Sequence, residues 1–130
     1  MNSALFDTCF LIDLEREIRR GSGKAHQYLV QNPNLRPCIS WVVAGEFAEG
    51  FGDIHHPACS AMLVRFDILP MDEKTANYYA VQSSRLRASQ QQIGTNDLWI
   101  ACAGLAYSMP VVTNNSAHFG RVIGLSVIGY

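Results

Sequence analysis

The segment 94–106 constrains the fold of this chain more than any other. It reads Gly-Thr-Asn-Asp-Leu-Trp-Ile-Ala-Cys-Ala-Gly-Leu-Ala, and its last nine residues are apolar all round. A helix that has no polar face is a buried helix. Thr95 is predicted to cap it, because a threonine hydroxyl accepts from an unpaired N–H of the first turn. Asp97 then lies in the first turn of a buried helix. There its charge either complements the positive end of the helix dipole or belongs to a polar or metal site.

Two further isolated acids favour a shared site. Asp7 follows the apolar run 4–6, and Glu46 lies inside the apolar segment 41–48. Three carboxylates on separate buried elements predict one site, and a hard divalent cation is the usual reason to gather them. Glu49 shares a helix face with Glu46 and is its rival. Glu46 is preferred because its immediate neighbours are more apolar.

Composition predicts a single globular domain over residues 1–130. The hydrophobic content is 48% and the charged content 16%, which is typical of a chain with a proper core. The net charge of −1 counts against a dedicated nucleic-acid binder, although three site acids would leave ten Lys and Arg against eight Asp and Glu. No apolar run is long enough to span a bilayer, and residues 1–3 lack a basic start. We therefore expect a cytoplasmic protein without a membrane partner.

Cysteines and histidines give no independent metal motif. The four cysteines are Cys9, Cys38, Cys59 and Cys102. Because they form no C-x-x-C pair, they are interpreted as small buried thiols. His55 and His56 have no acid or cysteine at ligand spacing, so a solvated pair is expected.

Strands and helices alternate along the chain. Strands are expected at residues 4–6, 36–40, 66–70, 109–113 and 125–128. Helices are expected at residues 8–18, 24–31, 41–51, 58–64, 72–89 and 95–106, with one turn at 118–121. Alternation predicts an α/β fold in which helices cover both faces of a parallel sheet. Ligands of such sheets gather at the carboxyl ends of the strands, where Asp7 and Asn115 fall.

Four segments together resemble a known family. They are Phe-Asp-Thr at 6–8, Val-Ala-Gly-Glu-Phe at 43–47, Ile-Gly-Thr-Asn-Asp-Leu-Trp-Ile-Ala at 93–101, and Val-Thr-Asn-Asn at 112–115 with His-Phe at 118–119. In order and in chain length they resemble the PIN-domain ribonucleases, specifically the VapC-type toxins of toxin–antitoxin pairs. The resemblance covers nearly the whole sequence.

The resemblance implies a three-layer α/β/α sandwich with a mainly parallel sheet of four to five strands. It implies a toxin that is an endoribonuclease dependent on Mg²⁺ or Mn²⁺, forms a homodimer and is neutralised by an antitoxin protein. Asp7 and Asp97 match direct metal ligands, and Glu46 matches the acid that holds a metal-bound water or accepts its proton. Thr8 and Thr113 are expected to steady the carboxylates. Arginines of the first and fifth helices are expected to line the groove and contact RNA phosphates.

Two positions depart from the family pattern. Asn115 stands where the family commonly has a fourth acid, and His118 stands where some relatives have a glutamate. Asn115 can coordinate a cation through its carbonyl or orient a water, so it is kept as a candidate catalytic residue. It brings no charge, and a second metal ion is therefore less well supported.

Two other classes of function stay open. A catalytically weak PIN-like interaction module is compatible with Asn115. A small-substrate metal-dependent phosphatase would use Asp7 as its nucleophile. That enzyme needs a basic clamp for phosphate, and neither Lys24 nor Lys74 is expected near a strand end.

Overall fold

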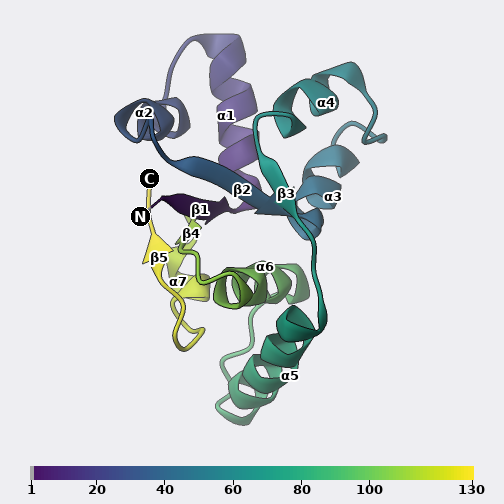
Figure 1. Cartoon of the computed structure of the whole chain (residues 1–130), viewed down its shortest axis with the longest axis vertical. Helices are drawn as coiled ribbons and strands as arrows, with labels where there is room; N and C mark the ends of the chain where they lie inside the picture. The colour runs from purple at the N-terminus through teal and green to yellow at the C-terminus, as the bar shows by residue number, and fades with distance from the viewer. Residues whose placement is uncertain (1) are drawn as a thin grey trace.

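The computed structural model describes residues 2–130 and contains a sheet of five parallel strands. The strands are β1 (Ser3–Phe6), β2 (Arg36–Ser40), β3 (Asp67–Leu69), β4 (Val111–Val112) and β5 (Val127–Ile128). Their order is β3-β2-β1-β4-β5, and every neighbouring pair is parallel (Figure 1). The predicted α/β class with a parallel sheet is confirmed.

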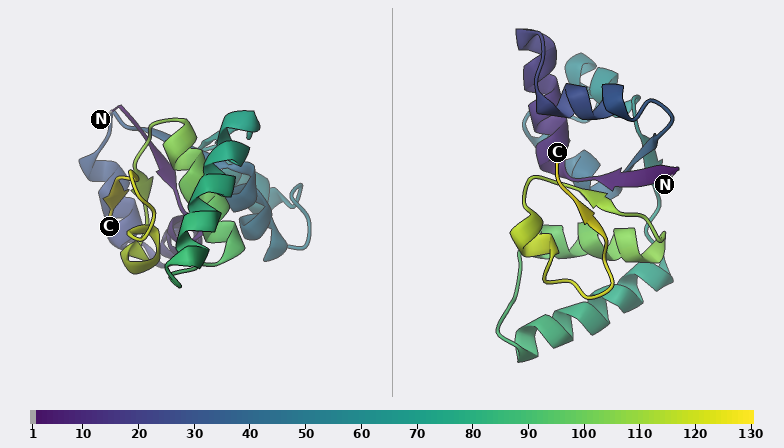
Figure 2. Two further views of the ribbon diagram at one scale, coloured as in Figure 1. Left: turned by 90° about the horizontal axis from the view of Figure 1, so that it is seen from below. Right: turned by 90° about the vertical axis from the view of Figure 1, so that its left-hand side faces the viewer.

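Helices cover both faces of this sheet. They are α1 (Thr8–Arg20), α2 (Lys24–Gln31), α3 (Trp41–Glu49), α4 (Pro57–Leu63), α5 (Glu73–Ala88), α6 (Thr95–Ala106) and α7 (Ser116–Phe119). Helices α1 to α4 lie on one side, and α5 to α7 lie on the other, with α5 outside α6 (Figures 1 and 2). The three-layer sandwich expected from the resemblance is therefore confirmed. None of the helices in this part of the chain is both long enough and apolar enough to cross a membrane.

The central strand β1 is buried on both faces. Ala4, Leu5 and Phe6 are all completely buried, as expected for a continuous apolar run in the middle of a parallel sheet. The Phe6 ring packs against Phe10 at a centroid distance of 4.5 Å. Burying a side chain of this size stabilises the fold by about 1.5–3 kcal/mol. Residue 7 thus directly follows a strand whose last three residues are completely buried.

The apolar helix α6 is buried, as its sequence predicts. Leu98 and residues 100–104 are buried against the sheet and neighbouring helices. A Cβ added at Gly104 would lie 2.9 Å from Leu125 Cδ1 and 3.0 Å from Val111 Cγ2, which is closer than real Cβ contacts come. Glycine therefore lets α6 approach β4. The first turn of the same helix carries Asp97.

The predicted cap of α6 was wrong. Gly94 is the N-cap of α6, and Thr95 is already its first helical residue. Helix α1 is capped by the extended residue Asp7, whose side chain accepts from the Thr8 N–H at 2.7 Å. A carboxylate that emerges from a strand is placed to accept this bond, whereas a side chain inside the helix is not. Ser40 caps α3, and its side chain accepts from the Val43 N–H.

The outer strands are shorter than predicted. Only Asp67–Leu69, Val111–Val112 and Val127–Ile128 pair in the sheet, where residues 66–70, 109–113 and 125–128 were expected. Their parallel pairing extends over only two or three residue pairs with each neighbouring strand. The last helical turn spans Ser116–Phe119, two residues earlier than predicted.

Candidate active site

A pocket opens where the strand order reverses. Strands β1 and β4 are adjacent, but the chain proceeds from β1 outward to β2 on one side and reaches β4 and β5 on the other. Loops that follow two such strands diverge and leave a crevice at their carboxyl ends. The pocket at this edge is lined by Asp7, Thr8, Cys9, Ile12, Glu46, Asp97, Asn114 and Asn115. Three carboxylates that are distant in the sequence thus share one pocket.

Asp7 is the most firmly held of these acids. It is only 5% exposed, and its backbone N–H donates to the Val112 carbonyl at 3.0 Å. Its Oδ1 accepts from the Thr8 N–H, and its Oδ2 accepts from Thr113 Oγ1 at 2.8 Å. The Cys9 thiol also donates to Oδ2 at 3.3 Å. These donors stabilise a buried charge that would otherwise be costly.

Glu46 reaches the pocket from α3. Its Oε1 accepts from Thr8 Oγ1 at 2.5 Å, and its Oε2 accepts from Asn96 Nδ2 at 3.0 Å. Thr8 therefore contacts both Asp7 and Glu46 and holds the two carboxylates in a fixed relation. Glu49, the rival candidate, is exposed and is not part of the pocket lining.

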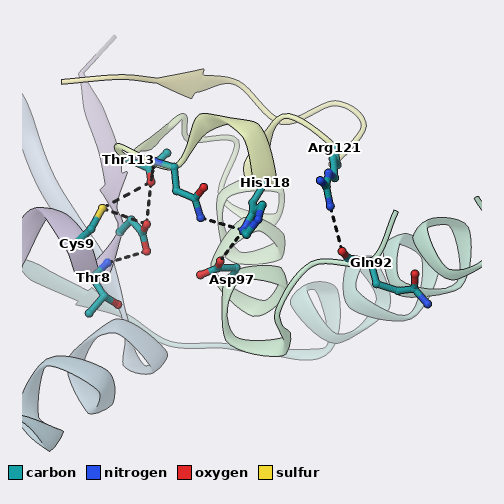
Figure 3. Close-up of polar contacts among 9 residues, drawn as sticks. Thr8, Cys9, Gln92, Asp97, Thr113, His118 and Arg121 are labelled. Atoms are coloured by element: carbon teal, nitrogen blue, oxygen red, sulfur yellow. Dashed lines mark hydrogen bonds and ion pairs between the residues drawn. The ribbon is translucent and has the colours of Figure 1, made fainter. Parts of the chain in front are cut away.

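Asp97 completes the acidic lining from the first turn of α6. Burial raises the pKa of its carboxyl above the usual value, and the negative charges of Asp7 and Glu46 raise it further. His118 opposes this effect, with its Nδ1 lying 3.7 Å from Asp97 Oδ2 (Figure 3). Each of these carboxylates makes a negative charge on Asp97 harder to hold, so a cation in the pocket would relieve their repulsion.

Asn115 borders the same pocket at the N-cap of α7. Its backbone N–H donates to Thr113 Oγ1 at 3.0 Å, so it is tied to the hydroxyl that holds Asp7. Its side-chain Nδ2 lies 2.9 Å from His118 Nδ1. The amide is therefore held by α7 beside the carboxylates.

The donor set of the pocket suits a hard cation. Asp7, Glu46, Asp97 and Asn115 offer oxygen, the ligand atom that Mg²⁺ and Mn²⁺ prefer. Within residues 2–130, no three His, Cys, Asp or Glu side chains form a preassembled metal cluster. The carboxylate oxygens of Asp7 and Glu46 instead accept hydrogen bonds from protein donors such as Thr8. Binding a cation would therefore require some of these oxygens to turn toward it.

Comparison with known proteins decides the family. The chain is 30% identical over 98 residues to ribonuclease VapC1 of Haemophilus influenzae (strain R2866), a match that covers 72% of this chain and 73% of that protein. The chain belongs to the VapC ribonuclease family. Ribonuclease VapC4 of Mycobacterium tuberculosis is 28% identical over 85 residues, covering 60% of this chain and 65% of VapC4. No protein-family model matches the sequence.

Solved VapC-containing structures share the fold. The structure of VapBC2 from Rickettsia felis, bound to a DNA fragment from their promoter, matches with a TM-score of 0.80 and 23% identity over 98% of both chains. DNA-bound VapBC from Salmonella typhimurium matches with a TM-score of 0.76 and 22% identity, covering 99% of this chain and 98% of that chain. At this identity the likeness concerns the fold, which extends over nearly the whole chain.

Three contacts in this VapC pocket do not follow from the sequence patterns. Cys9 was interpreted as a buried thiol, but it is half-buried, lines the pocket and contacts Asp7. Asn96 holds Glu46, and His118 holds Asn115. The sequence did offer one signal for two of these residues: Cys9 lies two positions after Asp7, and Asn96 directly precedes Asp97. The other three cysteines are buried and free, as predicted.

The arginines expected in the groove do not line this pocket. Arg16 of α1 is exposed, and Arg19 pairs with Glu15 at 2.9 Å. Arg85 of α5 donates to the Gln82 side chain and to the carbonyl of residue 121. Helix α1 runs away from the sheet edge (Figure 1), so the basic residues of its last turn are carried away from the acids.

The histidine pair also has a structural role. His55 and His56 are exposed, and His56 Nδ1 accepts from the Ala58 N–H at 3.1 Å to cap α4. The cap gives His56 a role without a metal ion, and both rings are exposed, as expected.

Proposed function

We propose that this VapC-family chain is a divalent-metal-dependent endoribonuclease and the toxin of a toxin–antitoxin pair. The observation that carries this proposal is the pocket in which Asp7, Glu46 and Asp97 come together from β1, α3 and α6. No lysine or arginine of residues 2–130 lines that pocket, so no protein cation neutralises its three acids. A bound divalent cation explains why they are gathered.

Asp7 and Asp97 would hold Mg²⁺ or Mn²⁺ directly, with Glu46 beside it. When bound, the cation would lower the pKa of a water molecule and stabilise negative charge on the scissile phosphate. Asp7 is oriented for this task by the Thr8 N–H and the Thr113 hydroxyl. These two contacts limit the rotation of the carboxylate and so fix where its free lone pairs point.

Glu46 is the candidate general base. Thr8 and Asn96 each hold one of its oxygens, which keeps the carboxylate near the pocket without adding a formal charge. A carboxylate in this position accepts a proton from an attacking water while the phosphodiester bond breaks. Asn115 supplies a neutral polar group on the far side of the pocket.

The substrate class and partners follow from the family. We propose RNA as the substrate, an antitoxin protein as the partner that blocks the pocket, and a homodimer as the working form. A small-substrate phosphatase is disfavoured, because it requires a basic clamp and the pocket lining has none among residues 2–130. An inactive interaction module has no need of three carboxylates gathered in one pocket.

Cleavage of a labelled RNA by the purified chain tests the proposal. We expect cleavage with Mg²⁺ or Mn²⁺, none with EDTA, and a loss of at least about 100-fold for Glu46→Gln if it is the base. Glu49→Gln is the matched control, because it makes the same change one turn away on the exposed face of α3. Cleavage that persists in EDTA, or equal activity of the two variants, would contradict the proposed site.

A further inference from the structure

A second pocket, which we call the Arg87 pocket, shares the first turn of α6 with the acidic pocket. It has a volume of about 230 Å³ and is enclosed by helix α5, the loop after it and the start of α6. Asp97 lines the acidic pocket, whereas Thr95 and Leu98 line this one. Residues three apart share a helix face, but residues two apart do not. The two pockets therefore flank the same helical turn.

The lining of the Arg87 pocket is rich in hydrogen-bond donors. Its polar members are Tyr79, Ser83, Arg87, Gln92 and Thr95. Among residues 2–130, no acid lines the pocket, and the exposed Arg87 guanidinium forms no ion pair. A guanidinium only donates, and hydroxyl groups can donate, so this lining matches an anion whose oxygens only accept. The acidic pocket has the opposite charge and suits a cation.

The size of the Arg87 pocket limits what it can hold. Sites for drug-sized ligands occupy about 300–1,000 Å³. At about 230 Å³, the pocket suits a group such as a phosphate better than a whole small molecule.

Hydrogen bonds connect the walls of the two pockets. Arg121 Nη1 donates to the carbonyl of Gln92 at 3.2 Å (Figure 3). Arg85 Nη2 in turn donates to the carbonyl of Arg121 at 2.6 Å. Arg121 follows helix α7, whose N-cap Asn115 lines the acidic pocket. The loop that closes the Arg87 pocket is thus tied to the segment that borders the acids.

The surface between the two pockets is open at the start of α6. Gly94, Thr95 and Asn96 are exposed, and a Cβ added at Gly94 would meet nothing within 4 Å. A helix with its side chains is about 10–12 Å across. A nucleic-acid strand that rises roughly 3.4 Å per nucleotide covers this width in about three nucleotides. One strand can therefore reach both pockets.

We propose that the Arg87 pocket binds a backbone phosphate of the RNA substrate about three nucleotides from the scissile bond. This inference rests on the proposed ribonuclease function. Three carboxylates repel RNA, and Arg87 supplies a favourable charge beside them. Because the contact is to phosphate, it holds the strand in place without selecting a base sequence.

The salt dependence of RNA binding tests this contact. A labelled single-stranded RNA is titrated by fluorescence anisotropy with Mg²⁺ in the Glu46→Gln background, which slows cleavage. Loss of one phosphate contact to a single strand lowers the slope of log affinity against log salt by about 0.7. We expect this change for Arg87→Gln, and it corresponds to about fourfold weaker binding at 0.15 M salt.

Arg20→Gln is the matched control. Arg20 is also an exposed arginine in the last turn of its helix, and it forms no ion pair among residues 2–130. Both variants therefore remove one positive charge that complements a helix dipole. Helix α1 carries Arg20 away from the acids (Figure 1), so its loss should leave the salt slope unchanged.

Two further arms locate the contact. Ser83→Asp keeps Arg87 but adds a negative charge to the pocket lining, and it should weaken RNA binding at least as much as Arg87→Gln. RNA trimmed to fewer than about three nucleotides on the flank that reaches Arg87 should bind equally to the proteins with and without Arg87→Gln. A difference that persists for RNA trimmed on either flank would mean an isolated anion site and would overturn the proposed strand path.

The outcomes separate this inference from the proposed function. If the wild type cleaves RNA with Mg²⁺ but Arg87→Gln and Arg20→Gln have equal salt slopes, only the phosphate contact is overturned. Unchanged binding by Ser83→Asp would overturn it as well. If Arg87→Gln lowers the slope but the wild type does not cleave, the contact stands and the proposed function falls. A chain that binds no RNA would overturn both.

Discussion

Thr113 connects the sheet to the acidic pocket, and its hydroxyl has a calculable effect on stability. The residue is completely buried at the end of β4. Its Oγ1 donates to Asp7 Oδ2 at 2.8 Å and accepts from the Asn115 N–H at 3.0 Å. Thr113→Val keeps the shape of the side chain and removes these two hydrogen bonds, together with the weaker 3.7 Å contact between Oγ1 and Cys9 Sγ.

The expected cost is about 3 kcal/mol in the free energy of unfolding. A hydrogen bond to a charged group contributes about 1.5–3 kcal/mol, and a buried donor left without a partner costs about 1–3 kcal/mol. Asn115 is only half-buried, so water can reach its N–H and the second contribution falls at the low end. A loss of about 3 kcal/mol is a large part of the roughly 5–15 kcal/mol that stabilises a typical domain.

Thr75 is the matched control for this substitution. It is also completely buried, but its Oγ1 has no hydrogen-bond partner within residues 2–130. Thr75→Val makes the same chemical change without breaking a bond. Removing an unsatisfied buried hydroxyl should leave stability unchanged within about 0.5 kcal/mol or increase it.

Urea unfolding of both variants in EDTA at neutral pH measures the difference. EDTA removes any cation whose binding to Asp7 would be altered by the change. Thr113→Ser, which keeps Oγ1, should fall between the wild type and Thr113→Val. If the two valine variants differ by less than about 1 kcal/mol, the hydroxyl of Thr113 does not stabilise Asp7, and the reasoning is refuted.

Four further predictions concern the pocket and the assembly. The raised pKa of Asp97 means that folding favours its protonated form, so the metal-free wild type loses stability as the pH rises above the usual carboxyl value of 3.8. Asp97→Asn should therefore be more stable than the wild type in EDTA by an amount that is larger at neutral pH than at about pH 4, and a constant difference by urea unfolding would contradict this. Mg²⁺ or Mn²⁺ at a hundred times its dissociation constant should add about 2.7 kcal/mol and raise Tm, and an equal rise in Asp7→Ala would place the ion elsewhere. Asn115→Asp should lower the Mg²⁺ concentration for half-maximal cleavage, whereas Asn115→Ala should cost less activity than loss of any of the three acids; an unmoved Mg²⁺ curve would mean that residue 115 does not face the cation. Light scattering at micromolar concentration should find a homodimer, and a monomer would count against the proposed assembly.

The sequence alone was enough for the fold class and the buried elements. Alternating strand and helix signals predicted the parallel sheet, because a strand covered by helices on both faces must be apolar throughout, as β1 is. The apolar run after Asp97 predicted a buried α6 for the same reason. An acid in such a run is conspicuous, and for that reason Asp7, Glu46 and Asp97 stand out in the sequence by themselves. Each of these inferences depends on near neighbours in the chain.

Only the tertiary structure decided which groups touch. Thr8 bonds to Glu46 across 38 positions of the sequence, and Thr113 bonds to Asp7 across 106. The missed contact of Cys9 with Asp7 depends on the turn from strand into helix, and that of His118 with Asn115 depends on where α7 begins. The arginines of α1 that were expected in the groove lie elsewhere, because α1 carries its last turn away from the sheet. Side-chain hydrogen bonds depend on distances of a few tenths of an ångström, and those distances are set by packing between elements, which local sequence patterns do not encode.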